Sequence, residues 1–369
     1  MYNNKFKSII FILILVLIAP NFAAAEDTAV ESAADVEFFL EVLDYIKESY
    51  PFEIEERTLI EGALKGMLQS VDPYSNYYTP EEANSLYSGL SGTFSGVGIY
   101  IEEKDGYINV NSTMKGQPAE KAGIQKDDLI IMVNDIDIKD LGIEKVSSMI
   151  KGVTGTKVTV TVKRGEKLHR YEVTRETITI SPVHSEVLED NIGYIQLEDF
   201  SSQATKDMKK ALSEFDKKGI NKIILDLRDN PGGLLDQAVS IAKLFVTKGP
   251  IVHTRGSDDE LFTYSSKLTK SKYKLVVLVN ENSASASEIL AGAIKDRKAG
   301  VLIGTKTFGK GIVQSLSPVV DGSLIKLTTS EYLTPNKTSI HGKGIEPDIQ
   351  VKNTATEDLQ LKKAIGELK

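Results

Sequence analysis

The sequence of 369 residues has no cysteine, only 4 histidines and no apolar run long enough to cross a membrane. Without cysteine the chain forms no disulfide and offers no thiol for a lipid anchor. The most apolar stretch, Ile9 to Ala19, falls well short of the roughly 20 residues that span a bilayer. Acidic residues outnumber basic ones, 52 to 44, for a formal charge of −8. This balance disfavours nucleic acid as a partner.

The four histidines, His169, His184, His253 and His341, are scattered singly along the chain. None has acidic or cysteine neighbours at the spacing of a metal site such as H-E-x-x-H. A zinc site and a Ser-His-Asp triad therefore both lack support, and we expect no metal and no cofactor.

The first residues have the order of a secretory signal peptide. Lys5 and Lys7 precede the apolar stretch, and small residues follow it up to Ala25. We predict a signal peptide over residues 1–25, since the stretch is too short for an uncleaved anchor. Cleavage removes two lysines, so the exported chain carries a formal charge of −10, two less than the −8 of the full chain.

The pattern of apolar residues and glycines changes at three points along the rest of the chain. Residues 26–88 carry apolar side chains at helical spacing. Residues 89–178 have short β runs separated by glycines, as in a compact β-rich module. Residues 179–353 alternate strands and helices, which predicts βαβ crossovers and a sheet with helices on its faces. Residues 354–369 resemble a short amphipathic helix.

Three serines alternate with alanines in NSASASEI, between an apolar strand and a helix. A helix N-terminus offers free N–H groups and a partial positive charge, which suits a nucleophile. The segment also fits a capping box, in which Ser285 and Glu288 only close the first helical turn. The local sequence by itself favours the cap.

Serine chemistry without histidine needs another base, and a buried, neutral lysine can serve. Lys310 lies between two glycines in TKTFGKGIVQ, with no carboxylate close by in sequence. Most lysines flanked by glycine are turn residues, so this signal alone is weak.

Two glycine-rich turns could bring backbone N–H groups to a ligand. DLRDNPGG follows a buried-looking strand and ends in a turn at Pro231–Gly233; an ordinary tight connection explains it equally well. SGVGIYI resembles a loop that catches a terminal carboxylate while the strand edge pairs with a peptide. A nucleotide-binding loop is disfavoured, because no G-x-G-x-x-G spacing is present.

Four motifs occur in the order typical of one family: FSGVGIYIEE…GQPAEKAGIQKDDLIIMVND, DLRDNPGG, NSASASEILAGAIKDRKAG and GTKTFGKGIVQ. With VDPYSNYYTPEE and YLTPNKTSIHGKGIEPDI, they make most of residues 70–350 resemble the carboxyl-terminal processing, or tail-specific, serine proteases that carry a PDZ domain. This resemblance implies a mixed α/β, multi-domain fold: a ClpP/crotonase-like α/β protease core, an inserted PDZ domain and N-terminal helices. The domains would then be residues 1–25, 26–88, 89–178, 179–353 and 354–369.

The resemblance implies a nucleophile at Ser285, a general-base lysine at Lys310 and a lysine-orienting glutamine at Gln314. Gln314 can reach the lysine only if the backbone bends, because four residues of straight strand span about 13 Å. Ser283 and Ser287 become neighbours of the nucleophile.

The resemblance also implies roles for two backbone amides and one aspartate. The oxyanion hole falls on the N–H groups of Gly232 or Gly233 and of Ala286. An aspartate linked to activity in relatives falls on Asp296, roughly 16 Å along a continuous helix from Ser285, so we expect a structural role for it.

The tail-binding loop falls on Gly96, Val97, Gly98 and Ile99, with isoleucine where many PDZ domains have phenylalanine.

The expected function is an exported serine endopeptidase that binds unstructured, apolar C-terminal tails and cleaves through an acyl-enzyme. Its partners would be protein or peptide substrates, its location periplasmic or otherwise extracytoplasmic, with or without membrane association. The amphipathic helices are compatible with a homo-oligomer. The alternative is a non-catalytic PDZ adaptor that holds exported proteins by their C-termini.

Overall fold

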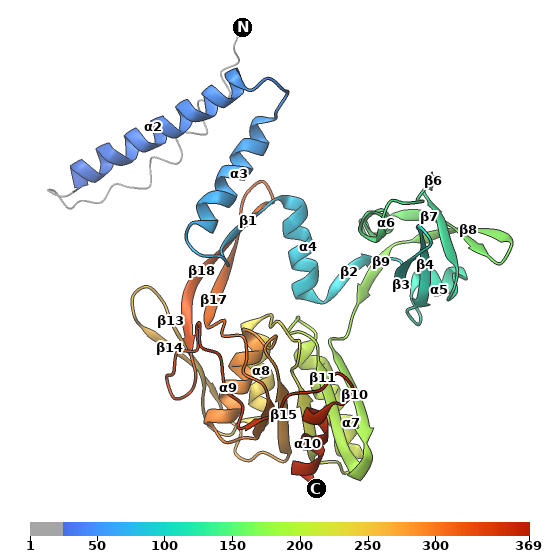
Figure 1. Ribbon diagram of the computed structural model, residues 1–369, viewed down its shortest axis with the longest axis vertical. Helices are drawn as coiled ribbons and strands as arrows, with labels where there is room; N and C mark the ends of the chain where they lie inside the picture. The colour runs from blue at the N-terminus through green and yellow to red at the C-terminus, as the bar shows by residue number, and fades with distance from the viewer. Residues whose placement is uncertain (1–24) are drawn as a thin grey trace. The chain divides into compact units, whose positions relative to one another are not determined.

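The computed structural model describes residues 25–369, so the predicted signal peptide, except Ala25, lies outside the described residues. The chain divides into two compact units, residues 1–70 and 71–369. The described part of the first unit consists of helices α2 (Ala25–Ser49) and α3 (Glu56–Gln69) (Figure 1). No helix in residues 25–369 is long and apolar enough to cross a membrane.

The second unit is built around a six-stranded sheet in the order β10-β11-β12-β15-β16-β19. Only the β10–β11 pair is antiparallel, as expected for βαβ crossovers. The strands are β10 (Val183–Leu188), β11 (Ile192–Leu197), β12 (Lys222–Asp226), β15 (Lys274–Val279), β16 (Val301–Gly304) and β19 (Ile349–Gln350). A short 3-10 helix, η1 (Glu189–Asn191), links the first two.

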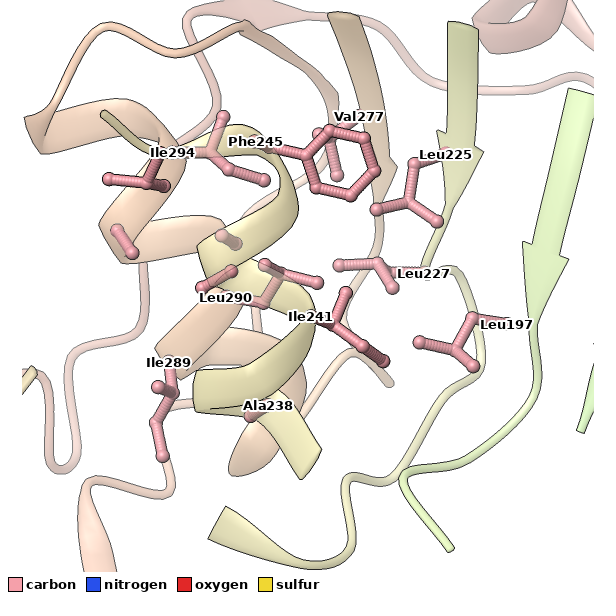
Figure 2. Close-up of a cluster of buried hydrophobic side chains, with 14 of the residues drawn as sticks. Leu197, Leu225, Leu227, Ala238, Ile241, Phe245, Val277, Ile289, Leu290 and Ile294 are labelled. Carbon is pink, nitrogen blue, oxygen red and sulfur yellow. The ribbon is translucent and has the colours of Figure 1, made fainter. Parts of the chain in front are cut away.

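Helices cover both faces of this sheet. Successive side chains of a strand point to opposite faces, and here both faces carry apolar side chains that the helices bury. Leu225 and Val277 pack on one face against α7 (Ala204–Lys217), α8 (Leu235–Phe245) and α9 (Ala286–Asp296). Figure 2 shows α8 and α9 contributing Ile241, Phe245, Leu290 and Ile294 to this core. Ile224 and Val276 pack on the other face against α10 (Leu359–Leu368).

A second, antiparallel sheet carries the segment after the lysine motif. Its order is β1-β18-β13-β14, and β17 also pairs with β18. The strands are β1 (Asn76–Tyr78), β13 (Gly249–Arg255), β14 (Leu261–Ser266), β17 (Ile312–Pro318) and β18 (Leu324–Leu333). Helix α4 (Pro80–Ser91) follows β1 and begins with a capping box between Thr79 and Glu82.

The inserted β-rich module has its own core around Val110, Ile130 and Val160. Its sheet runs β3-β4-β5-β7-β8, with β6 paired to β5 and β3 at the edge. Its elements are β3 (Ile99–Lys104), β4 (Tyr107–Thr113), α5 (Pro118–Ala122), β5 (Leu129–Val133), β6 (Ile136–Asp137), α6 (Ile143–Ile150), β7 (Lys157–Arg164) and β8 (Lys167–Thr174). The chain enters and leaves the module through the paired strands β2 (Thr93–Gly96) and β9 (Glu176–Thr179).

The mixed α/β, multi-domain architecture predicted from the sequence is confirmed, while the domain boundaries stay predictions. The mostly helical segment before residue 88 also holds strand β1, which is stable only because it pairs with β18 from the far end of the chain. The C-terminal helix begins at Leu359 and buries Ala364 and Leu368 against the sheet. That apolar face is therefore used within the chain.

Candidate active site

Ser285 occupies the turn between β15 and α9, directly before the first helical residue. Its backbone has φ 55° and ψ −113°, a conformation that costs a non-glycine residue on the order of 1–3 kcal/mol. Its carbonyl oxygen accepts hydrogen bonds from the Tyr332 hydroxyl at 2.9 Å and the Ile289 amide at 3.0 Å. Burial raises the pKa of Tyr332 well above its ordinary value, so this hydroxyl keeps the proton that it donates.

Ser285 and Glu288 form the capping box that the local sequence favours, with both halves present. The Ser285 amide donates to the Glu288 carboxylate at 2.9 Å, and the Glu288 amide faces the Ser285 side chain. The same Glu288 amide donates to the Ser285 carbonyl oxygen at 2.8 Å, so the turn is also held through the backbone. A cap and a nucleophile would therefore share one hydroxyl.

The two flanking serines are structural. Ser283 and Ser287 are buried, and their hydroxyls donate to the carbonyl oxygens of Leu227 at 2.7 Å and Asn230 at 2.9 Å. Both bonds attach the serine loop to the DLRDN segment. Within the described residues, no bond of this kind joins the Ser285 hydroxyl to the DLRDN segment; its side chain faces the Glu288 amide in the capping box.

The carboxylate of Glu288 joins the serine segment to the lysine segment. It is fully buried and accepts the amides of Ser285 and Lys310 on Oε2, both at 2.9 Å. Its Oε1 accepts the Gly309 amide at 2.7 Å and the Thr307 hydroxyl at 2.6 Å. Four donors on one anion are the usual condition for burying a carboxylate without a cation.

Lys310 has the environment that a lysine base requires. Its amine is half-buried, and burial lowers its pKa below the ordinary value, helped by the charge of Lys326 and opposed by Asp72. The amine lies 4.7 Å from the ring centre of Tyr74 and donates to Gln314 Oε1 at 3.0 Å. Desolvation favours the neutral amine, which is the form that accepts a proton.

Gln314 reaches the lysine because the backbone bends. Gly309 has φ 93°, and the β17–β18 register shifts between Val313 and Gln314. The Gln314 amide also donates to the carbonyl oxygen of Tyr74, so its orientation is set from two sides. Within the described residues, no hydrogen bond joins the Lys310 amine to the Ser285 hydroxyl.

The Pro-Gly-Gly turn lies directly against the serine. A Cβ on Gly232 would come within 2.8 Å of Ser285 Cβ and 3.0 Å of the Ala286 amide nitrogen. The Gly232 amide itself donates to Asn230 Oδ1 at 2.9 Å. In the described part of the chain, the amides of Gly233 and Ala286 have no hydrogen-bond acceptor, so the geometry favours these two over Gly232 as oxyanion donors.

Asp296 lies at the far end of α9 and accepts the Asn336 amide at 2.8 Å. This bond anchors the loop after β18. It accords with the structural role expected from its distance to Ser285 along the helix.

The tail-binding positions Gly96, Val97, Gly98 and Ile99 lead into the edge strand β3. Gly98 has φ 78°, and a Cβ there would lie 2.5 Å from Gln117 Cβ, so only glycine fits. The four residues, together with Ile150 from α6, line the part of a groove that lies on this module. An open strand edge beside an apolar groove is the geometry that binds an extended peptide.

Three residues of this region were missed by the sequence analysis: Tyr74, Asn230 and Tyr332. Asn230 is fully buried; its carbonyl and side chain bind the amides of Ala284 and Gly232. Only its position inside DLRDNPGG could have pointed to it. Tyr74 and Tyr332 lie inside the segments VDPYSNYYTPEE and YLTPNKTSIHGKGIEPDI, but no local pattern shows that they contact Lys310 and Ser285, so only the tertiary structure reveals these contacts.

Comparison with known proteins identifies the families that parts of this chain match. Family models match residues 191–351 as peptidase family S41, 110–164 as a PDZ domain and 19–82 as the N-terminal domain of the activating protease CtpB. The carboxy-terminal processing protease CtpA of Bacillus subtilis is 41% identical, over 83% of this chain and 67% of that protein. This chain belongs to the carboxyl-terminal processing serine proteases.

Two further relatives support the assignment of this chain to the carboxyl-terminal processing proteases. A probable CtpA-like serine protease of Staphylococcus epidermidis is 39% identical, over 96% of this chain and 72% of its own length. The solved structure of the photosystem II D1 C-terminal processing protease is 30% identical and superposes with a TM-score of 0.51, over 89% of this chain and 90% of that one. The chain is thus a serine-type processing peptidase with a PDZ domain.

Proposed function

We propose that this protein is an exported endopeptidase that cleaves through Ser285 and Lys310 and takes its substrates by their unstructured, apolar C-terminal tails. The observation that carries the proposal is the half-buried Lys310 amine, whose pKa is lowered and whose hydrogen bond to Gln314 orients it. The backbone amides of Lys310 and Ser285 both donate to the Glu288 carboxylate, and Ser285 is held in a strained turn at a helix N-terminus.

In the acylation step the neutral Lys310 amine takes the proton of the Ser285 hydroxyl as the oxygen attacks the peptide carbonyl. The carbonyl oxygen becomes an oxyanion, which the amides of Gly233 and Ala286 stabilise. The C–N bond then breaks, and the leaving amine takes the proton from Lys310. Water, deprotonated by the same amine, releases the acyl group and restores the serine.

This chemistry requires the lysine to turn from Gln314 toward Ser285. Gln314 and the Tyr74 carbonyl hold the amine next to the site, and the Tyr74 ring covers it. The ring favours a cation, so it supports the protonated lysine that forms during attack. No metal or cofactor enters any step.

The PDZ domain supports the tail preference, because its groove adjoins the open edge of β3. The signal-peptide pattern at the N-terminus supports export, and an exported protease would meet its substrates in the extracytoplasmic space. A homo-oligomer stays a prediction.

The test is digestion of a protein with a flexible apolar C-terminal tail by the mature chain and by Ser285→Ala and Lys310→Ala. Lys306→Ala is a matched control, because Lys306 precedes the same loop and pairs with Glu346 at 3.3 Å. We expect cleavage by the unchanged chain and by the control only. Equal cleavage by all four chains refutes the Ser-Lys mechanism, and tail binding without cleavage by the unchanged chain indicates an adaptor.

A further inference from the structure

The first half of the DLRDNPGG motif has no part in the reaction described above, yet it holds a dense cluster of charged groups. The Arg228 guanidinium is 14% exposed and makes several bonds to Asp226, the shortest at 2.6 Å. Asp226 is buried at the end of β12 and also accepts the Tyr194 hydroxyl at 2.7 Å. This arrangement leaves Arg228 little freedom on the side of the sheet.

The other side of the same guanidinium holds the C-terminal helix. Arg228 Nη1 donates to both oxygens of Asp358, at 2.8 and 2.9 Å, and to Gln360 Oε1 at 3.2 Å. Asp358 is the N-cap of α10 and accepts the Leu361 amide at 3.0 Å. Arg228 therefore bonds the start of α10. It is also the residue directly before the turn of residues 229–233, here called the oxyanion turn.

The segment from Arg228 to Gly233 needs such support, because its backbone is unusual. Asp229 has φ 59°, and Gly232 and Gly233 have φ 107° and 144°. The Arg228 amide donates to Asp226 at 2.9 Å, and Asp229 accepts the side-chain amides of Asn280 and Asn282, at 2.9 and 2.8 Å. A small displacement of an oxyanion donor is enough to lose its contribution.

We propose that Arg228 is a positioning residue that transmits the docking of α10, through Asp358, to the oxyanion turn. The inference rests on the proposed function, since it assumes that the Gly233 amide stabilises the oxyanion. It assigns to the C-terminal helix a part in catalysis at a distance from the serine and the lysine.

Asp358→Asn separates this role from simple anchoring. Asparagine caps a helix as well as aspartate, so α10 keeps its N-cap and its apolar face while the charged bond to Arg228 is weakened. Glu357→Gln is the matched control: it removes the same charge one position earlier, from a residue that pairs with Lys362 at 2.7 Å and not with Arg228.

The measurements are kcat and KM for a tailed peptide, the pH profile of kcat/KM, and the affinity for a peptide boronate, whose tetrahedral adduct imitates the oxyanion. We expect Asp358→Asn to lower kcat and boronate affinity by about tenfold, below the 10²–10³ of a lost oxyanion donor. We also expect KM and the lysine limb of the pH profile to be unchanged, and Glu357→Gln to behave as the parent chain.

Unchanged boronate affinity and kcat in Asp358→Asn, or equal losses in both variants, overturn the inference. So does a loss of activity matched by an equal loss of folded protein, because that indicates anchoring alone. Cleavage by Ser285→Ala in the same assay refutes instead the proposed function on which the inference rests.

Discussion

Gly232→Ala tests whether the Pro-Gly-Gly turn is built against the nucleophile. The added Cβ would lie 2.8 Å from both the Ala284 carbonyl oxygen and Ser285 Cβ, and 3.0 Å from the Ala286 amide nitrogen. Ordinary contacts between carbon atoms lie at about 3.5–4.0 Å, so the turn and the serine must move apart. All three contacts are with the segment that carries the proposed nucleophile.

The energetic cost has two parts and one small offset. A non-glycine residue at φ 107° costs about 1–2 kcal/mol, and relieving the overpacked contacts costs about 1–3 kcal/mol. Replacing glycine also reduces the entropy of the unfolded chain, which returns about 0.4–1 kcal/mol. The free energy of unfolding should fall by about 1–5 kcal/mol.

Activity should fall further than stability. The displaced serine and oxyanion amides should lower kcat/KM, per folded molecule, by about 100-fold or more. Gly219→Ala is the control: Gly219 has φ 70° in the same domain, and its Cβ would meet nothing within 4 Å. Urea unfolding and peptide cleavage measure the two effects, and a Gly232→Ala activity within threefold of Gly219→Ala would refute the reasoning.

Four further predictions concern three residues, Lys310, Glu288 and Asp296. Activity should rise with pH as the amine of Lys310 loses its proton, because burial lowers its pKa; a flat kcat/KM from pH 5 to 9 contradicts a lysine base. The unfolded chain keeps the Lys310 proton to a higher pH than the folded chain does. The free energy of unfolding should therefore rise with pH between the folded and the unfolded pKa of Lys310, and urea unfolding of Lys310→Met should not show this rise. Glu288→Gln can bind the amides of Ser285 and Lys310 or that of Gly309, but not all three, so cleavage should fall at least tenfold; parent-like cleavage contradicts this. Asp296→Ala loses the bond to Asn336 and should lower the unfolding free energy by about 1 kcal/mol without shifting the pH profile of cleavage; a shifted profile contradicts a structural role.

Local pattern was sufficient for much of the α/β core. The sequence predicts alternating strands and helices over residues 179–353, and β11, α7, β12, α8, β15, α9 and β16 follow one another in this way, with only the β13–β14 hairpin inserted between α8 and β15. The antiparallel strands β13, β14, β17 and β18 were not predicted. Strands β13 and β14, like β17 and β18, form hairpins across short connections that the sequence analysis missed, and among these strands only the β13–β18 pairing joins segments far apart in sequence. Strand β1, within a segment predicted as helical, depends on long-range pairing of this kind.

The sequence by itself determined the family, the mixed α/β class and the order of the motifs, because these depend on residue types and spacing along the chain. It also named Ser285, Lys310 and Gln314 as candidates, but it left a cap and a nucleophile as competing explanations of one serine.

The tertiary structure decided how these residues are held. Glu288 joins the serine and lysine segments through four donors, and Tyr74 holds Gln314 from a segment 240 positions earlier. The Asn230 side chain accepts the Gly232 amide, which favours Gly233 as the proposed oxyanion donor. Burial, hydrogen-bond competition and lysine desolvation depend on groups that meet only when the chain has folded, so no local pattern contains them.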